Sequence, residues 1–70
     1  MLFTKYSEKK FDILNKYKIF YTKENIIDVI NNPNKAGKKN KFLFAEKNNI
    51  KVLYKIEEEV KKIITFFPVK

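Results

Sequence analysis

A stripe of mostly apolar residues recurs at helical spacing near the amino end of the chain. It consists of Lys10, Phe11, Ile13, Leu14 and Tyr17. The positions follow i, i+3, i+4 and i+7, with the phenylalanine widening the face, which predicts an amphipathic helix. Ser7 offers a side-chain oxygen to cap the amino end, so the helix is expected to begin at Glu8.

A second helix is expected after the segment KIFYT, whose residues prefer extended backbone. Thr22 is a candidate N-cap, and Glu24 in the first turn suits the partial positive charge of a helix amino end. The buried face would consist of Ile26, Ile27 and Ile30. Because Pro33 disfavours helical geometry at Asn32, this helix is expected to end there.

Two strands are expected in the second half of the chain, after a loop. The segment NPNKAGKKNK, residues 32–41, contains the only glycine and has the composition of a loop. The segments KFLFAEK and IKVLYKI then indicate strands over residues 41–47 and 50–56. Since Asn48 and Asn49 tolerate the left-handed backbone of a tight hairpin, we expect these two strands to pair.

The closing stretch EEEVKKIITFFPVK allows two interpretations. Helical spacing relates Ile56, Val60, Ile63, Ile64 and Phe67. Residues 63–67 are an unbroken run of β-branched and aromatic residues, which suits a pleated strand better than a helix. A third helix would leave a two-stranded hairpin, which is marginal in water. We therefore predict a strand over residues 60–67, with the preceding glutamates as a turn.

The predicted fold is α+β and forms one domain over residues 1–70. Two amino-terminal helices would pack on one face of a three- to four-stranded antiparallel sheet. The fourth strand would be a short initial one near Leu2 and Phe3.

Composition excludes several kinds of chemistry. The 70-residue chain has no cysteine and no histidine, which excludes disulfides, thiol nucleophiles, thiolate metal sites and imidazole acid-base catalysis. Asp12 and Asp28 fall on separate predicted helices, and the glutamates of residues 57–59 point in different directions, so no metal site and no cofactor are expected. There is no apolar run of roughly 18 residues and no leader-like segment, so we expect a cytoplasmic protein that does not bind membranes.

Positive charge is concentrated in the middle of the chain. The net charge is +8, every basic residue is lysine, and residues 33–56 carry seven lysines against Glu46 alone. Cationic surfaces attract phosphate, which makes nucleic acid a candidate partner. The alternative is compositional, because an A/T-rich genome encodes an excess of Lys, Asn, Ile, Phe and Tyr.

Three segments together resemble a known family. The segment FTKYSEKKFDILNKYKIFYTKENIIDVINNPN, followed by IKVLYKI and KIITFFP, is similar to a family of small uncharacterised domains grouped with the RelE, ParE and BrnT toxins of toxin-antitoxin systems. The resemblance runs from Phe3 to Pro68 and includes no catalytic motif. It implies two helices on one face of a curved antiparallel sheet.

The resemblance also implies functions. In RelE-type members the exposed concave face of the sheet holds RNA, and Lys, Arg and Tyr side chains assist cleavage by the ribose 2′-hydroxyl. ParE-type relatives bind a topoisomerase, and many members bind an antitoxin. This chain has Tyr6 and Lys51 where the family usually has histidine and arginine, and it stops at FPVK where relatives continue.

Two sets of candidate site residues follow. For cleavage, proton transfer and charge neutralisation would be shared by Tyr6, Lys10, Lys51 and Lys70. For RNA binding, the candidates are Lys35, Lys38, Lys39, Lys41, Lys47, Lys51 and Lys55. Alternation in IKVLYKI places Lys51 and Lys55 on one strand face beside Leu53, with Tyr6, Tyr21 or Phe42 available for base stacking. The alternative is that Leu53 packs inward and the lysines only solubilise an edge.

The sequence therefore predicts a toxin-like RNA-binding protein of a toxin-antitoxin type system. Its cleavage activity would be weakened or absent, and metal-independent if present. The alternative is a protein-interaction module, without catalysis, whose partner is an antitoxin-like peptide or another protein. That partner would cover the sheet face or add to an edge strand.

Overall fold

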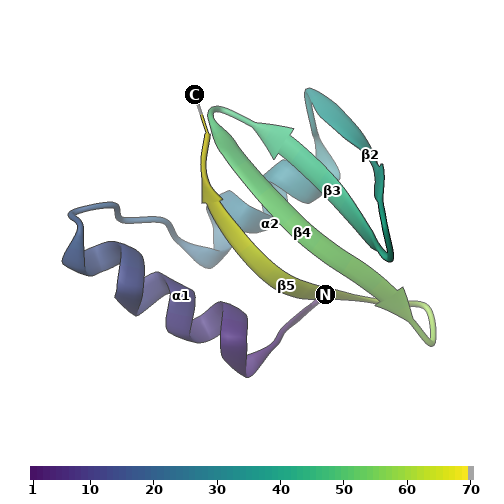
Figure 1. The fold of residues 1–70 in the computed structure, drawn as a ribbon, viewed down its shortest axis with the longest axis horizontal. Helices are drawn as coiled ribbons and strands as arrows, with labels where there is room; N and C mark the ends of the chain where they lie inside the picture. The colour runs from purple at the N-terminus through teal and green to yellow at the C-terminus, as the bar shows by residue number, and fades with distance from the viewer. Residues whose placement is uncertain (70) are drawn as a thin grey trace.

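The computed structural model describes residues 1–69 and contains two helices followed by most of a sheet (Figure 1). The elements are β1 (Leu2–Phe3), α1 (Lys5–Lys16), α2 (Lys23–Asn31), β2 (Lys35–Lys39), β3 (Phe42–Lys47), β4 (Ile50–Glu57) and β5 (Val60–Pro68). The strand order in the sheet is β1-β5-β4-β3-β2. The α+β class and the strand in the closing stretch are thus confirmed.

The sheet has five strands and is mixed, so the expected three- to four-stranded antiparallel sheet is corrected on both points. The short initial strand is present, but β1 pairs with β5 in parallel, with Leu2 opposite Lys62. The other new strand is β2, which lies inside the segment expected to be a loop. Its Ala36 and Gly37 pair with Ala45 and Phe44, so cross-strand pairing overrides the loop-like composition.

A β-bulge in β5 decides which of its side chains enter the core. Leu53 of β4 pairs with Thr65, whereas the next residue, Tyr54, pairs with Ile63. Ile64 is therefore the extra residue, and it shifts the alternation of β5 by one position. As a result Ile63 and Phe66, three residues apart, are both fully buried.

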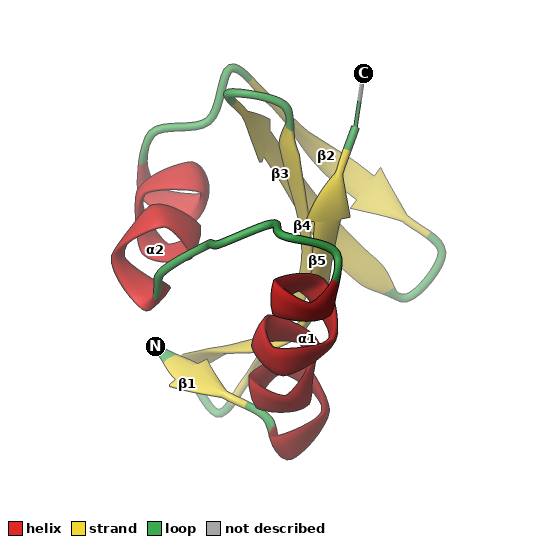
Figure 2. Ribbon diagram, turned by 90° about the vertical axis from the view of Figure 1, so that its left-hand side faces the viewer, coloured by secondary structure: helices red, strands yellow, loops and turns green. Residues whose placement is uncertain are grey.

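Both helices cover the same face of the sheet (Figure 2). Helix α1 contacts β5, and α2 contacts β3 and β4. The core consists of Leu14, Ile26, Val29, Ile30, Ala45, Ile50, Val52, Ile63 and Phe66. Within residues 1–69, no helix is long and apolar enough to cross a membrane.

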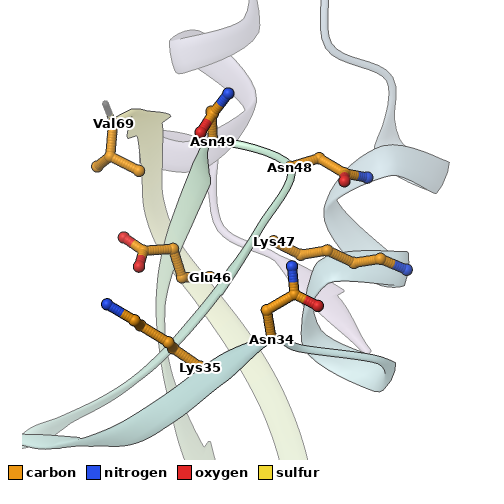
Figure 3. A pocket seen from close by; sticks show the side chains of 7 residues that line it. All are labelled: Asn34, Lys35, Glu46, Lys47, Asn48, Asn49 and Val69. Atoms are coloured by element: carbon orange, nitrogen blue, oxygen red, sulfur yellow. The ribbon is translucent and has the colours of Figure 1, made fainter.

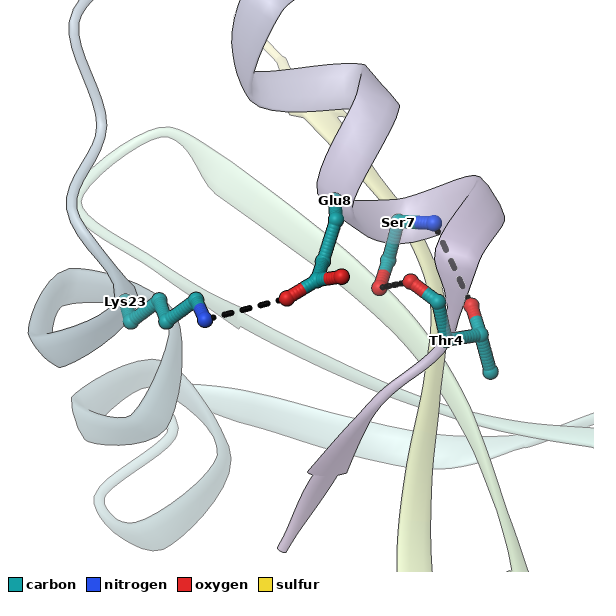
Figure 4. Close-up of polar contacts among 4 residues, drawn as sticks. All are labelled: Thr4, Ser7, Glu8 and Lys23. Carbon is teal, nitrogen blue, oxygen red and sulfur yellow. Dashed lines mark hydrogen bonds and ion pairs between the residues drawn. The ribbon is translucent and has the colours of Figure 1, made fainter.

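Helix α1 begins earlier than expected, and it buries a different face. Its N-cap is Thr4, whose side-chain oxygen accepts a hydrogen bond from the Ser7 backbone N–H at 3.2 Å, so Ser7 is inside the helix rather than its cap (Figure 4). The Ser7 hydroxyl is fully buried and donates to the Thr4 carbonyl at 2.8 Å. The buried side of α1 is therefore formed by Ser7 and Leu14, whereas Ile13 and Tyr17 of the expected stripe are exposed.

Thr4 also ties the helix to the sheet. Its hydroxyl donates to the Ile63 carbonyl at 2.8 Å, which joins the start of α1 to β5. One turn further on, Glu8 accepts a hydrogen bond from the Lys23 ammonium at 3.1 Å, and this ion pair links α1 to the first residue of α2 (Figure 4). One hydroxyl thus joins the amino end of α1 to the sheet, and one exposed ion pair joins it to the amino end of α2.

The connection between the helices has a defined geometry. Lys18 adopts φ 63°, and the backbone N–H groups of Lys18 and Ile19 donate to the carbonyls of Asn15 and Leu14. These two bonds are those of a Schellman motif, which ends α1 and turns Ile19 back onto the core. Thr22 is confirmed as the N-cap of α2, within a capping box with Asn25.

Two tight turns join the three central strands. Asn48 and Asn49 both have positive φ, as the expected hairpin requires. Glu58 and Glu59 adopt the same left-handed conformation between β4 and β5, with φ of 51° and 66°. The expected turn in the glutamate run is confirmed, although glutamate is not a residue that favours this conformation.

We expect Thr4→Val to lower the free energy of unfolding by about 2 kcal/mol, because it removes both the helix cap and the bond to Ile63. Thr4→Ser keeps the hydroxyl and should retain most of the stability. Urea denaturation followed by circular dichroism measures both. A valine variant as stable as the wild type would contradict the role given to this hydroxyl.

Candidate nucleic-acid interface

One face of the sheet is not covered by the helices, and its residues follow from the strand register. Because Val52 and Ala45 point into the core, their neighbours along β4 and β3 point to the other side. We call this side the open face. It consists of Lys35, Gly37, Lys39, Phe42, Phe44, Glu46, Lys51, Leu53, Lys55, Glu57, Val60, Lys62, Thr65 and Phe67.

The open face contains a shallow hollow with an apolar floor. It has a volume of about 150 Å³ and is lined by Lys39, Asn40, Phe42, Lys51, Leu53 and Phe67. Three strands each supply one apolar side chain, and each of these side chains is half-buried. Part of this apolar surface is accessible to water, and Lys39 and Lys51 lie at its border.

A glycine and a lysine position the ring of Phe44 beside this hollow. A Cβ on Gly37 would lie 2.9 Å from Cε1 of Phe44, so the ring lies directly against the backbone of β2. The Lys51 ammonium lies 4.8 Å from the centroid of the same ring. Glycine in this strand therefore permits a close aromatic contact, and the ring of Phe44 lies within cation–π range of the Lys51 ammonium on the open face.

Charge on the open face is mainly positive. It carries five lysines and two glutamates, an excess of three positive charges. Glu57 accepts from Lys62 at 2.7 Å and pairs with Lys55 at 3.2 Å, and these two ammonium groups lower the pKa of its carboxyl. Glu46 lies opposite Lys35 and Lys51 in the register. Lys39 is opposite Phe42 rather than an acid, and no acidic residue lines the hollow itself.

The structure separates the seven lysines proposed for RNA binding. Four of them lie on the open face: Lys35, Lys39, Lys51 and Lys55. Lys41 is in the turn between β2 and β3, and Lys38 points to the opposite side of the edge strand. Lys47 lies on the helix side and extends toward α2, where its ammonium donates to Asp28 at 2.8 Å (Figure 3).

The four residues proposed for cleavage are not brought together. Tyr6 and Lys10 belong to α1, on the covered side of the sheet, whereas Lys51 points to the open face. Lys70 lies outside the described residues. No single phosphate can therefore contact Tyr6 and Lys51 at once in this arrangement.

The stacking candidates are also divided between the two sides. Phe42 lines the hollow, but Tyr21 packs against Phe66 on the core side, with ring centroids 6.2 Å apart. Burial raises the pKa of the Tyr21 hydroxyl. Leu53 lies on the open face, so the alternative that it packs inward is wrong.

Three residues of the hollow region escaped the sequence interpretation: Asn40, Phe44 and Phe67. Asn40 and its neighbours were assigned to a loop, and Phe44 was not assigned to a face. Phe67 looked like one more residue of a continuous apolar run. The signal that would have found Phe67 is the bulge at Ile64, and no local pattern announces a bulge of this kind.

A larger hollow of about 280 Å³ lies at the end of the sheet near the turn between β3 and β4 (Figure 3). It is lined by Asn34, Lys35, Glu46, Lys47, Asn48, Asn49 and Val69. Its lysines are accompanied by Glu46 and it has no aromatic side chain, whereas the smaller hollow of the open face has aromatic side chains and no acidic one among its lining residues. Within residues 1–69, no group of three or more acidic side chains is placed to hold a metal ion.

Comparison of the chain with protein-family models, with curated proteins and with solved structures finds no match.

The contact between Gly37 and Phe44 predicts a specific coupling. Gly37→Ala should lower the free energy of unfolding by about 1 kcal/mol, because the ring must move away from the new methyl group. In a Phe44→Ala background the same change should instead stabilise by about 0.5 kcal/mol, since alanine suits a strand better than glycine. Urea denaturation of the four proteins measures this coupling. Equal effects in both backgrounds would contradict the contact.

The pairing of Asp28 predicts a dependence on pH. Hydrogen bonds from Lys47 and then Asn32 lower the pKa of its carboxyl, so the ionised form stabilises the folded protein at neutral pH. This stabilisation is lost as the pH falls below the ordinary aspartate value of about 3.9 and through the lower folded value. Asp28→Asn should therefore melt at a lower temperature than the wild type near neutral pH.

At strongly acidic pH the two melting temperatures should converge. Asp12→Asn, which removes a carboxylate from α1, is the matched control and should keep the wild-type profile. Thermal melting followed across pH tests this expectation. A constant difference between Asp28→Asn and the wild type at all pH values would contradict the ionic role of Asp28.

Proposed function

We propose that this protein binds RNA on the open face of its sheet and does not cleave it. The observation that carries this proposal is the hollow itself, in which aromatic and aliphatic side chains are bordered by lysines on a face that no helix covers. Lysines along the strands neutralise backbone phosphates, and exposed rings offer stacking surfaces for bases.

Cleavage asks more of the surface than binding does. A proton must leave the 2′-hydroxyl, another must reach the leaving oxygen, and charge on the phosphate must be neutralised at the same place. Tyr6 and Lys10 lie across the sheet from Lys51, so the side chains considered for these steps do not converge. Binding without cleavage is the function consistent with this separation.

The proposed role extends to that of a toxin-like protein in a toxin-antitoxin pair. In support, both helices lie on one face of the sheet as the resemblance implies, although the sheet is mixed rather than antiparallel. In such a pair this protein would act by binding RNA without cutting it, and an antitoxin would bind this protein and prevent that.

A protein-interaction role is the second candidate, and a feature of α1 supports it. Tyr6, Ile13 and Tyr17 line one side of the helix at spacings of seven and four residues and are 63%, 46% and 74% exposed. Phe20, in the following connection, is 70% exposed. Lysines border this row, so an acidic amphipathic peptide would match it in charge and in apolar surface. A protein with only this function would not bind RNA.

RNA binding at increasing salt tests the proposal. Fluorescence anisotropy with a labelled single-stranded RNA should show affinity that falls steeply between about 50 and about 200 mM salt, because phosphate contacts release counterions. The double variant Lys51→Ala, Lys55→Ala should bind about tenfold more weakly and reduce the slope by about 1.

The matched control removes the same charge from the other side of the molecule. Lys9→Ala, Lys16→Ala changes two exposed lysines of α1 and should bind almost as tightly as the wild type. Equal loss in both double variants would show that net charge, not the open face, determines binding. A flat response to salt would contradict RNA binding and favour the protein-interaction role.

A further inference from the structure

We infer that the hollow in the open face takes one unpaired base of a single-stranded polynucleotide. This inference rests on the proposed function and narrows its substrate from RNA in general to RNA with an unstacked base. The shape of the hollow, the position of its lysines and the amide at its border each support it.

The size of the hollow fits a single ring. Pockets for drug-sized ligands begin at about 300 Å³, and this hollow is about 150 Å³. Phe42, Leu53 and Phe67 come from β3, β4 and β5, so the apolar floor extends across three neighbouring strands. A flat apolar group is the ligand that such a floor accommodates.

Each of the two aromatic residues that line the hollow has a lysine as its cross-strand partner. In the strand register Lys39 is opposite Phe42, and Lys51 is opposite Phe67. Leu53 lies two residues beyond Lys51 on the same strand and face. An apolar centre between two cations matches a nucleotide within a strand, whose base lies between two backbone phosphates.

Asn40 adds hydrogen-bonding capacity at the border of the hollow. It lies in the turn between β2 and β3 with φ 57°, a conformation that asparagine tolerates better than most residues. Its side-chain amide offers both a donor and an acceptor. An amide in this position can both donate a hydrogen bond to the edge of a base and accept one from it. Lysine can only donate, and phenylalanine can do neither.

The base must be unstacked to reach this floor. In a duplex, both faces of each base are covered by its neighbours, and a protein contacts mainly phosphates and 2′-hydroxyl groups. A side-chain floor on a sheet can contact the face of a base only when the strand is single and the base is turned out. A duplex would therefore bind only through the lysines.

The test compares oligonucleotides with and without bases. The probes are a uridine octamer, an abasic octamer with the same phosphates, and an eight-base-pair RNA duplex, each titrated by fluorescence anisotropy. The wild type should bind the uridine octamer about tenfold more tightly than the abasic octamer, since stacking one base contributes about 1–3 kcal/mol. The duplex should bind through its phosphates alone, so its affinity should fall with salt more steeply than that of the uridine octamer.

Two leucine variants then locate the effect. Phe42→Leu and Phe67→Leu keep apolar volume but remove the rings, so each should lose most of the preference for uridine while binding the abasic octamer as the wild type does. Circular dichroism of each variant checks that it is folded. Phe20→Leu makes the same change on an exposed residue of the helix side and should leave all three affinities unchanged.

The outcomes distinguish failure of the base site from failure of RNA binding as a whole. Equal, salt-dependent binding of the uridine and abasic octamers would overturn the base site and leave RNA binding by the lysines intact. If both leucine variants keep the preference for uridine, the base binds elsewhere, and the base site in the hollow is likewise overturned. If neither octamer binds, RNA binding and the base site are both wrong.

Discussion

The pairing of β5 with β4, including its bulge at Ile64, is the contact on which the rest of the structure depends. It places Ile63 and Phe66 in the core, where α1 packs against β5. It also leaves Phe67 beside Lys51 on the open face. With two short helices in a chain of 70 residues, only one face of a five-stranded sheet is covered. The other face of the sheet is the open face.

The local signals in the sequence were sufficient for much of the fold. Thr22 before α2, Pro33 after it and the Asn48–Asn49 turn each act through a mechanism confined to a few neighbouring residues, and each was correctly interpreted. The start of α1 was missed because both Thr4 and Ser7 are good caps. Thr4 is the cap that also donates a hydrogen bond to the carbonyl of Ile63, a residue distant in the sequence.

The remaining errors also arise from long-range pairing. Strand β2 has the composition of a loop, and only its register with β3, with Gly37 against Phe44, makes it a strand. The bulge gives the buried residues Ile63 and Phe66 a spacing of three, so simple alternation along β5 would assign Phe66 and Phe67 to the wrong faces. For the candidate site, alternation along β4 correctly placed Lys51 on the same face as Leu53. The hollow is formed by side chains from three strands, so no single strand predicts it.

The central claim is that RNA meets the sheet on the side away from the helices. Amide chemical shifts of ¹⁵N-labelled protein, followed as a uridine octamer is added, test this most directly. The account predicts that the largest changes occur at Lys39, Asn40, Phe42, Lys51, Leu53 and Phe67. Changes concentrated instead on α1, around Tyr6, Ile13 and Tyr17, would contradict it.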